Sequence, residues 1–237
     1  MARAGLASRR EIERWIQDGR VTVNGQSIEP GYHLKAGDYL QINGRVVKWD
    51  KYAEQPTRVL VYHKPVGELV TRRDPEGRPV IFSRLPRLEV GRWIAVGRLD
   101  INTSGLILVT NNGELANRLM HPARQVEREY AVRILGEVDE SMMQRLQQGV
   151  ELEDGPAHFD EVRFYAGEGA NRWFYVTVKQ GRNRLVRRLW ESQGVKVSRL
   201  IRVRYGEILL PERVRAHGFY ELEAKEITQL LEFVEMG

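Results

Sequence analysis

The feature that most constrains the fold is a series of short apolar segments of strand-like composition, separated by polar turns at irregular intervals. Strands favour β-branched and aromatic residues, whereas helices repeat apolar residues every three to four positions. By these criteria the strands outnumber the helices and do not alternate with them regularly. The sequence therefore predicts an α+β fold, with a mainly antiparallel or mixed β-sheet flanked by helices. The expected strands are 58–65, 105–110, 128–135, 159–165, 172–179 and 197–206, and the expected helices are 113–120, 139–149, 183–194 and 226–235.

The first part of the chain has the pattern of a separate small unit. Ser8 and Glu11 form a capping-box pattern at the start of an amphipathic helix. Two Asn-Gly dipeptides, at 24–25 and 43–44, are strong signals for tight hairpin turns. The segment that follows is polar and lacks periodicity. We expect a small domain at 1–49, a linker at 50–57 and a larger domain at 58–237.

The composition argues against cysteine chemistry, metal or cofactor binding, secretion and membrane insertion. The chain has no cysteine, which rules out disulfides, a thiol nucleophile and thiolate zinc sites. Its five histidines are scattered, and nucleotide-cofactor motifs are missing, so we expect neither a metal nor a cofactor. The sequence has no secretory signal and no apolar run near the roughly 20 residues of a membrane span. We therefore expect a cytoplasmic protein that does not bind a membrane.

Positive charge is concentrated in one stretch. The net charge of +5 is by itself weak evidence for a polyanionic partner. Residues 180–206, however, hold many basic residues against a single acid, Glu191, so ion pairs along a helix do not account for them. Such clustering is typical of proteins that bind nucleic acid. The basic residues are Arg182, Arg184, Arg187, Arg188, Lys196, Arg199, Arg202 and Arg204.

The segment Gly97–Gly105, GRLDINTSG, places one carboxylate in a polar turn just before an apolar strand. Asp100, Asn102 and Ser104 match the start of a calcium-binding loop, but Asn111 occupies the position where that loop needs a bidentate carboxylate. The calcium interpretation therefore fails. A simple turn remains open, because Asp and Asn bond readily to their own backbone. A catalytic carboxylate is the alternative.

Several segments resemble the pseudouridine synthases of the RsuA type. They are GRLDINTSGL (97–106), GELANRLMHPARQVEREYAV (113–132), GRNRLVRRLWESQGVKVSRLIRVRYGEI (181–208) and YHKPVGELVTRRDPEGRPVIFSRLP (62–86). The segment LASRREIERWIQDGRVTVNG (6–25) resembles the alpha-L RNA-binding motif that ribosomal protein S-four also contains. The resemblance covers nearly the whole chain. It implies a small RNA-binding domain, shortened at its start, joined to a catalytic domain that isomerises uridine to pseudouridine on a flipped-out base.

The resemblance also implies a role for each motif of the site. Asp100 of G-R-L-D corresponds to the family's catalytic aspartate, and Tyr130 of E-R-E-Y to its active-site tyrosine. Arg187 corresponds to the basic residue that pairs with the aspartate, which would keep the carboxylate ionised in a water-excluding pocket. Leu200 and Arg98 are expected to line the substrate pocket. Whether Asp100 adds to the nucleoside as a nucleophile or removes a ribose proton as a base stays open.

Other basic residues are expected to hold RNA phosphates, which gives affinity without sequence choice. His121 and Arg124, after the expected helix 113–120, are weaker candidates. The main candidates are Arg9, Arg10 and Arg14 in the small domain, and Arg182, Arg184 and Arg188 in the catalytic domain.

The partner that the resemblance implies is 23S ribosomal RNA, modified at position 2605, either free or within a large-subunit precursor. We expect a monomer. One alternative is a sister enzyme that modifies another site of ribosomal RNA. A second is a non-catalytic RNA-binding or ribosome-assembly factor on the same fold. A DNA-binding protein is disfavoured, because the sequence has no helix-turn-helix or heptad pattern.

Overall fold

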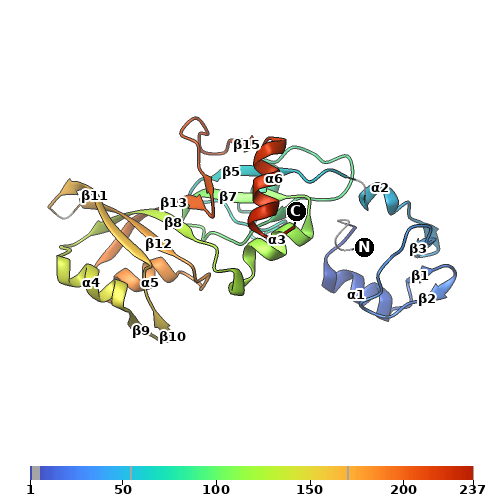
Figure 1. The fold of residues 1–237 in the computed structure, drawn as a ribbon, viewed down its shortest axis with the longest axis horizontal. Coiled ribbons are helices and arrows are strands. Elements are labelled where there is room, and N and C mark those ends of the chain that lie inside the picture. Colours follow the sequence, from blue (N-terminus) through green and yellow to red (C-terminus); the bar gives the residue numbers. More distant parts are fainter. Residues whose placement is uncertain (2–5, 54, 170, 237) are drawn as a thin grey trace.

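The computed structural model describes residues 1, 6–53, 55–169 and 171–236. The molecule is elongated, with a small N-terminal unit at one end and a large sheet through the rest (Figure 1). Within that described part, no helix combines the length and the apolar character needed to cross a lipid bilayer.

The N-terminal unit is one helix packed on a four-stranded sheet. Its elements are α1 (Arg9–Gln17), β1 (Val21–Val23), β2 (Gln26–Ser27), β3 (Leu40–Ile42) and β4 (Arg45–Val46), and the strand order is β2-β1-β3-β4. Ser8 caps α1 by accepting a hydrogen bond from the backbone N–H of Glu11 at 3.2 Å. Asn24 and Asn43 adopt φ values of 54° and 53°, the left-handed conformation that Asn-Gly hairpin turns need. The N-cap at Ser8 and the two Asn-Gly turns are therefore confirmed.

The sequence predicts an irregular linker at 50–57, but part of this segment is helical. It begins with one helical turn, α2 (Asp50–Ala53). Asp50 lies in the first turn and Lys51 in the last, where the helix dipole favours their charges. A four-residue helix is too short to show a periodic apolar pattern, so the sequence carries no signal for it.

The large sheet has nine strands and is mixed. They are β5 (Val59–Lys64), β6 (Ile94–Ala95), β7 (Ser104–Thr110), β8 (Arg128–Leu135), β11 (Glu161–Glu168), β12 (Asn171–Val178), β13 (Lys196–Tyr205), β14 (Ile208–Leu209) and β15 (Phe219–Glu221). The order is β11-β12-β8-β13-β7-β5-β15, with β6 on β7 and β14 on β13. Strands β13 and β7 run parallel, whereas the other pairs are antiparallel. This confirms the predicted α+β class with a mainly antiparallel sheet.

Helices and loops cover the sheet and close its core. They are α3 (Gly113–Met120), α4 (Glu140–Gln148), α5 (Leu185–Glu191), α6 (Ala224–Phe233) and the 3-10 helices η1 (Ile81–Ser83) and η2 (Pro122–Arg124). A separate pair, β9 (Val150–Leu152) and β10 (Gly155–Ala157), lies beside α5 (Figure 1). Helices α4 and α5 pack on β8 and β12, whereas α3 and α6 pack on β5 and β7. The half-buried Tyr130 contacts both the α4–α5 core and the core beneath η1.

Two helix boundaries differ from the expectation. The sequence predicts a helix at 226–235, but α6 begins at Ala224 because Glu223 and Glu226 form a reciprocal capping box. Glu is an unusual N-cap residue, so the sequence gives a weak signal there. The helix expected at 183–194 is shorter, because Arg184 precedes it with a left-handed φ of 48°.

Candidate active site

A cavity of about 950 Å³ lies where the loop before β7, the loop before α5 and strands β8 and β13 meet. Six of the expected site residues line it: Asp100, Tyr130, Leu200, Arg98, Arg182 and Arg184. Asp100 and Tyr130 are half-buried, Leu200 is buried, and Arg98 is exposed at the cavity wall. The fold thus brings together residues that are up to a hundred positions apart in the sequence.

The loop that carries Asp100 is held by backbone contacts on both sides. The Asp100 carbonyl accepts a hydrogen bond from the N–H of Thr103 at 3.0 Å, so the residue also forms the turn that its sequence context suggests. The N–H of Gly67 donates to the Ile101 carbonyl at 2.8 Å. A Cβ on Gly105, with φ of 107°, would lie 2.2 Å from the carbonyl oxygen of Arg202. Glycine therefore lets β7 approach β13 and sets where the Asp100 loop ends.

Arg187 lies behind the cavity wall and makes different contacts from those expected. Its guanidinium donates to the carbonyls of Asn102 at 2.8 Å and Val197 at 3.0 Å. Burial, with the nearby charge of Arg184, lowers the Arg187 pKa, and Asp100 partly offsets this. Among the ion pairs within 4.0 Å that the described residues form, none joins Arg187 to Asp100. The direct pair that the resemblance implies is absent from this part of the structure, and Arg187 instead orders the loop that carries the carboxylate.

Lys64 is a second buried cation near Asp100, and the sequence analysis missed it. Its side chain is 0% exposed, and its ammonium donates to the carbonyls of Thr103 at 2.7 Å and Pro65 at 2.9 Å. Burial lowers the Lys64 pKa to about 8, although Glu68 and Asp100 act in the opposite direction. The available signal was a lysine at a buried position of an otherwise apolar strand. Buried lysines are rare unless their charge is paired.

The buried carboxylate of Glu68 anchors the turn after β5. It accepts hydrogen bonds from the Tyr62 hydroxyl at 2.6 Å and lies 3.0 Å from Nδ1 of His217. Burial and this carboxylate raise the Tyr62 pKa well above its usual range. Glu68 therefore fixes the segment that contacts the Asp100 loop and places a negative charge near Lys64.

The far wall of the cavity is a cluster of two arginines and a tyrosine that the sequence analysis assigned no site role. The guanidinium carbons of Arg128 and Arg202 lie 5.1 and 5.0 Å from the centre of the Tyr205 ring. Both arginines are buried, at 9% and 3% exposure. Near the site, polar atoms of Thr103, Arg187 and Arg202 are buried without a hydrogen-bond partner in the structure as described. The wall thus carries cationic charge and unused hydrogen-bonding capacity.

The expected phosphate contacts near α5 divide into two kinds. Arg182 and Arg188 both bind the carboxylate of Asp154, Arg188 through two bonds of 2.7 and 3.0 Å. These hydrogen bonds hold the Asp154 pKa well below its usual range. Arg182 and Arg188 therefore tie α5 and its loop to the β9–β10 turn. Arg184 is more exposed, lines the cavity, and lies 3.7 Å from Glu191.

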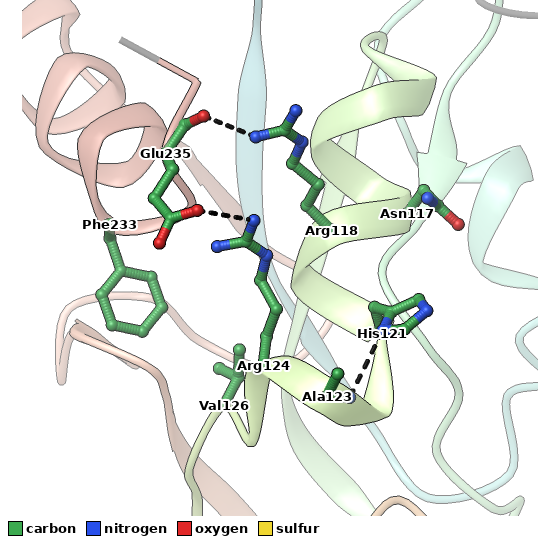
Figure 2. Close-up of a pocket in the computed structure, with 8 residues that line it drawn as sticks. All are labelled: Asn117, Arg118, His121, Ala123, Arg124, Val126, Phe233 and Glu235. Atoms are coloured by element: carbon green, nitrogen blue, oxygen red, sulfur yellow. Dashed lines mark hydrogen bonds and ion pairs between the residues drawn. The ribbon is translucent and has the colours of Figure 1, made fainter.

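The other expected RNA contacts lie away from the cavity. Arg9, Arg10 and Arg14 are exposed on α1. His121 and Arg124 line a second cavity beyond α3 (Figure 2). Within the described ranges, no group of three or more His, Asp or Glu side chains is placed to hold a metal ion.

The comparisons with known proteins agree with this geometry. Residues 58–192 match the family model of RNA pseudouridylate synthase, and residues 1–40 match that of the S4 domain. The chain is 56% identical to ribosomal large subunit pseudouridine synthase B of Escherichia coli K12, over 100% of this chain and 82% of that protein. It is 56% identical to the protein of the same name from Pasteurella multocida, over 99% of this chain and 68% of that protein.

A solved structure described as a pseudouridylate synthase has the same fold. It superposes with a TM-score of 0.68 at 23% identity and covers 97% of this chain and 96% of its own. The family match spans more than half of the chain and includes Asp100, Tyr130 and Arg187. The chain therefore belongs to the RNA pseudouridylate synthase family, as an isomerase with an S4 domain at its N-terminus.

Proposed function

We propose that this protein converts a uridine of 23S ribosomal RNA to pseudouridine, with Asp100 as the catalytic carboxylate. Support for the substrate comes from relatives that match the whole chain and are named ribosomal large subunit pseudouridine synthase B. Support for the residue is the position of Asp100 in the wall of a cavity that also carries buried cationic groups. That placement is the single observation on which the mechanism depends.

The reaction breaks the bond from ribose C1′ to uracil N1 and forms one from C1′ to C5. N1 gains a proton and C5 loses one. An ionised Asp100 can add to the nucleoside or remove a ribose proton, and both roles require the carboxylate to stay charged after water is excluded. The positive charges of Lys64 and Arg187 lie close enough to interact with the Asp100 carboxylate.

Tyr130 and Leu200 are proposed to hold the extruded base. The half-buried Tyr130 offers a ring face for stacking, and its hydroxyl can contact a polar edge of the uracil. Leu200, at 5% exposure, supplies an apolar wall. Arg98 and Arg184 lie at the rim, where they can contact the phosphates on either side of the flipped nucleotide. Contacts to phosphates do not depend on base identity. Arg98 and Arg184 would therefore hold the flipped nucleotide without selecting the bases beside it.

The decisive experiment is Asp100→Asn, assayed by tritium release from C5-labelled uridine in a 23S ribosomal RNA transcript. The variant keeps the shape of the side chain but cannot act as an anion. We expect activity to fall by at least about a thousand-fold, while RNA binding stays within about two-fold of the wild type. Near-normal tritium release would remove Asp100 from the mechanism.

The matched control is Asp139→Asn. Asp139 caps α4 on the exposed surface, and Asn caps a helix equally well. This variant should release tritium at the wild-type rate. A wild-type protein that binds the transcript without releasing tritium would favour the non-catalytic RNA-binding alternative. Modification at a position other than 2605 would make the chain a sister enzyme.

We further propose that residues 1–49 form an RNA-binding domain, joined through 50–57 to a catalytic domain at 58–237. The S4 match at residues 1–40 and the exposed arginines of α1 support this division. The small domain then contributes affinity through phosphates, and the cavity contributes the chemistry.

A further inference from the structure

A second cavity, of about 710 Å³, has no part in the chemistry proposed above. Figure 2 shows it between α3, η2 and the C-terminal end of α6. Its polar and aromatic lining residues are Asn117, Arg118, His121, Arg124, Phe233 and Glu235. The lining is basic apart from one acid, Glu235.

The donors of Arg118 are used in bonds within α3 and to the end of α6. Its guanidinium bonds to the Glu114 carboxylate at 2.9 Å and to the carbonyl of Val234 at 3.0 Å. It also donates to the carbonyl of Glu235 (Figure 2). Arg118 therefore attaches the end of α6 to α3, and it is not available to a ligand without loss of these bonds.

Arg124 and His121, in contrast, have donors to offer. In the described part of the chain, the Arg124 guanidinium donates to the Glu235 carboxylate at 3.1 Å. Nδ1 of His121 accepts from the N–H of Ala123 at 3.3 Å, which leaves the proton of a neutral ring on Nε2. Both side chains belong to the same short turn after α3.

Glu235 lines this cavity with an exposed side chain and an unfavourable backbone conformation. Its side chain is 79% exposed, and its backbone has a left-handed φ of 56°. A single exposed ion pair contributes little to stability, because both charges stay largely hydrated. The Glu235 carboxylate can therefore be displaced from Arg124 at little cost. Since a phosphate oxygen accepts from the same guanidinium donors, an RNA phosphate can take its place.

Neighbouring residues at the end of α3 line the two cavities. The N–H of Gly97 lies 2.8 Å from the sulfur of Met120, and both residues line the active-site cavity. His121, the next residue, lines the second cavity. An RNA strand that leaves the active site past Met120 therefore reaches His121 and Arg124 next.

We propose that this second cavity binds a backbone phosphate of the RNA substrate through Arg124 and His121, and that Glu235 holds the position of this phosphate in the free protein. The inference rests on the proposed function only in that the substrate is RNA. Glu235 then acts as an internal competitor that lowers affinity for RNA. Removing Arg124 weakens binding, whereas removing the charge of Glu235 strengthens it.

The test is a double-mutant cycle on RNA affinity, measured by fluorescence anisotropy with a 23S ribosomal RNA transcript at several salt concentrations. All proteins carry Asp100→Asn, so that the RNA stays unmodified. We expect Arg124→Gln to raise Kd about five-fold and to reduce the salt slope by about 0.7 to 0.9, the loss of one phosphate contact. We expect Glu235→Gln to lower Kd by about two- to five-fold.

The double variant separates this proposal from a general charge effect. If Glu235 competes for Arg124, then Glu235→Gln gives no gain once Arg124→Gln is present, and the effects are not additive. Arg145→Gln and Glu140→Gln, at exposed positions on α4, change the net charge equally and should leave Kd within about two-fold. Additive effects, or effects equal to those of the α4 controls, would overturn the proposal. If wild type fails to release tritium while the cycle behaves as expected, the phosphate site stands and the proposed activity falls.

Discussion

Arg187 and Arg188 are neighbours in the sequence but lie on different sides of α5. Arg187 is 7% exposed and binds the carbonyls of Val197 and of Asn102, which lies in the loop that carries Asp100. Arg188 has a more exposed side chain and binds the carboxylate of Asp154. In the sequence the two residues look equivalent, because each adds one positive charge to the same basic run. The structure shows that Arg187 contacts the loop that carries Asp100, whereas Arg188 contacts Asp154 of the β9–β10 turn.

The difference follows from what each charge loses and gains on folding. A buried guanidinium loses its hydration, and only fixed hydrogen bonds to the protein compensate for that loss. It therefore constrains the positions of the groups around it. A surface pair stays partly hydrated, is screened by salt and contributes little. The same contrast holds between the buried Lys64 and the exposed arginines of α1.

The largest expected effect that tests this comparison is that of Arg187→Gln. The change removes a cation near Asp100 and leaves the backbone carbonyls of Asn102 and Val197 without a charged donor. We expect kcat for tritium release to fall by about a hundred-fold or more, and the free energy of unfolding to fall by about 1–3 kcal/mol. Stopped assays on saturating RNA and urea denaturation measure the two quantities.

Arg188→Gln is the matched control for this prediction. It removes the same charge from the adjacent residue but leaves the catalytic loop untouched. We expect kcat within about two-fold of the wild type and a loss of stability of at most about 1 kcal/mol. Equal losses of kcat in the two variants would break the contrast between the two sides of α5.

A smaller effect is expected from titrating Lys64, whose pKa is lowered to about 8. Because its charge lies near Asp100, kcat should fall as pH rises above about 8. The fall should disappear in Lys64→Met, which starts from about ten-fold lower activity. A pH–rate profile of both proteins checks this, and an unchanged alkaline fall in Lys64→Met would assign that fall to another group.

The free energy of unfolding should rise with pH over the range in which kcat falls. The folded-state pKa lies below the usual 10.5, so the unfolded chain binds more protons between about pH 8 and 10.5. The contribution of Lys64 to stability therefore rises across that range, by at most about 3 kcal/mol at about 1.4 kcal/mol per pKa unit. The difference in unfolding free energy between wild type and Lys64→Met measures it.

The smallest effect on chemistry is expected from the double change Arg9→Ala and Arg10→Ala. These exposed residues are proposed to contact phosphates, so Kd for RNA should rise about five- to ten-fold and the salt slope should flatten by up to about two contacts. The kcat at saturating RNA should not change. An unchanged salt slope would show that the small domain does not clamp phosphates through α1.

Local signals predicted much of the fold and part of the site. Ser8 caps its helix, Asn24 and Asn43 form hairpin turns, and the main strands lie close to where their composition places them. The position of Asp100 in a turn before a strand was also visible, because the pattern is contained within a few residues. The strands of two or three residues were missed, since such short segments carry too little periodicity.

Pairings between distant residues could not be predicted in the same way. Arg182 stays a predicted RNA contact, but the sequence did not indicate that it binds Asp154, which is 28 positions away. Arg187 was expected to pair directly with Asp100, but its donors reach the carbonyls of Asn102 in the Asp100 loop and of Val197 in β13. No pattern along the chain indicates which acid or carbonyl will lie beside a given arginine.

The sequence by itself determined the α+β class, the local turns and the carboxylate of GRLD, because these depend on propensities and spacings within one segment. Only the tertiary structure decided that Lys64 and Arg187 are the buried cations near Asp100, that Arg188 is not, and that Glu235 rests against Arg124. The physical reason is that burial and electrostatic partners arise from packing between segments. The free energy of a charge depends on those surroundings far more than on its neighbours in the chain.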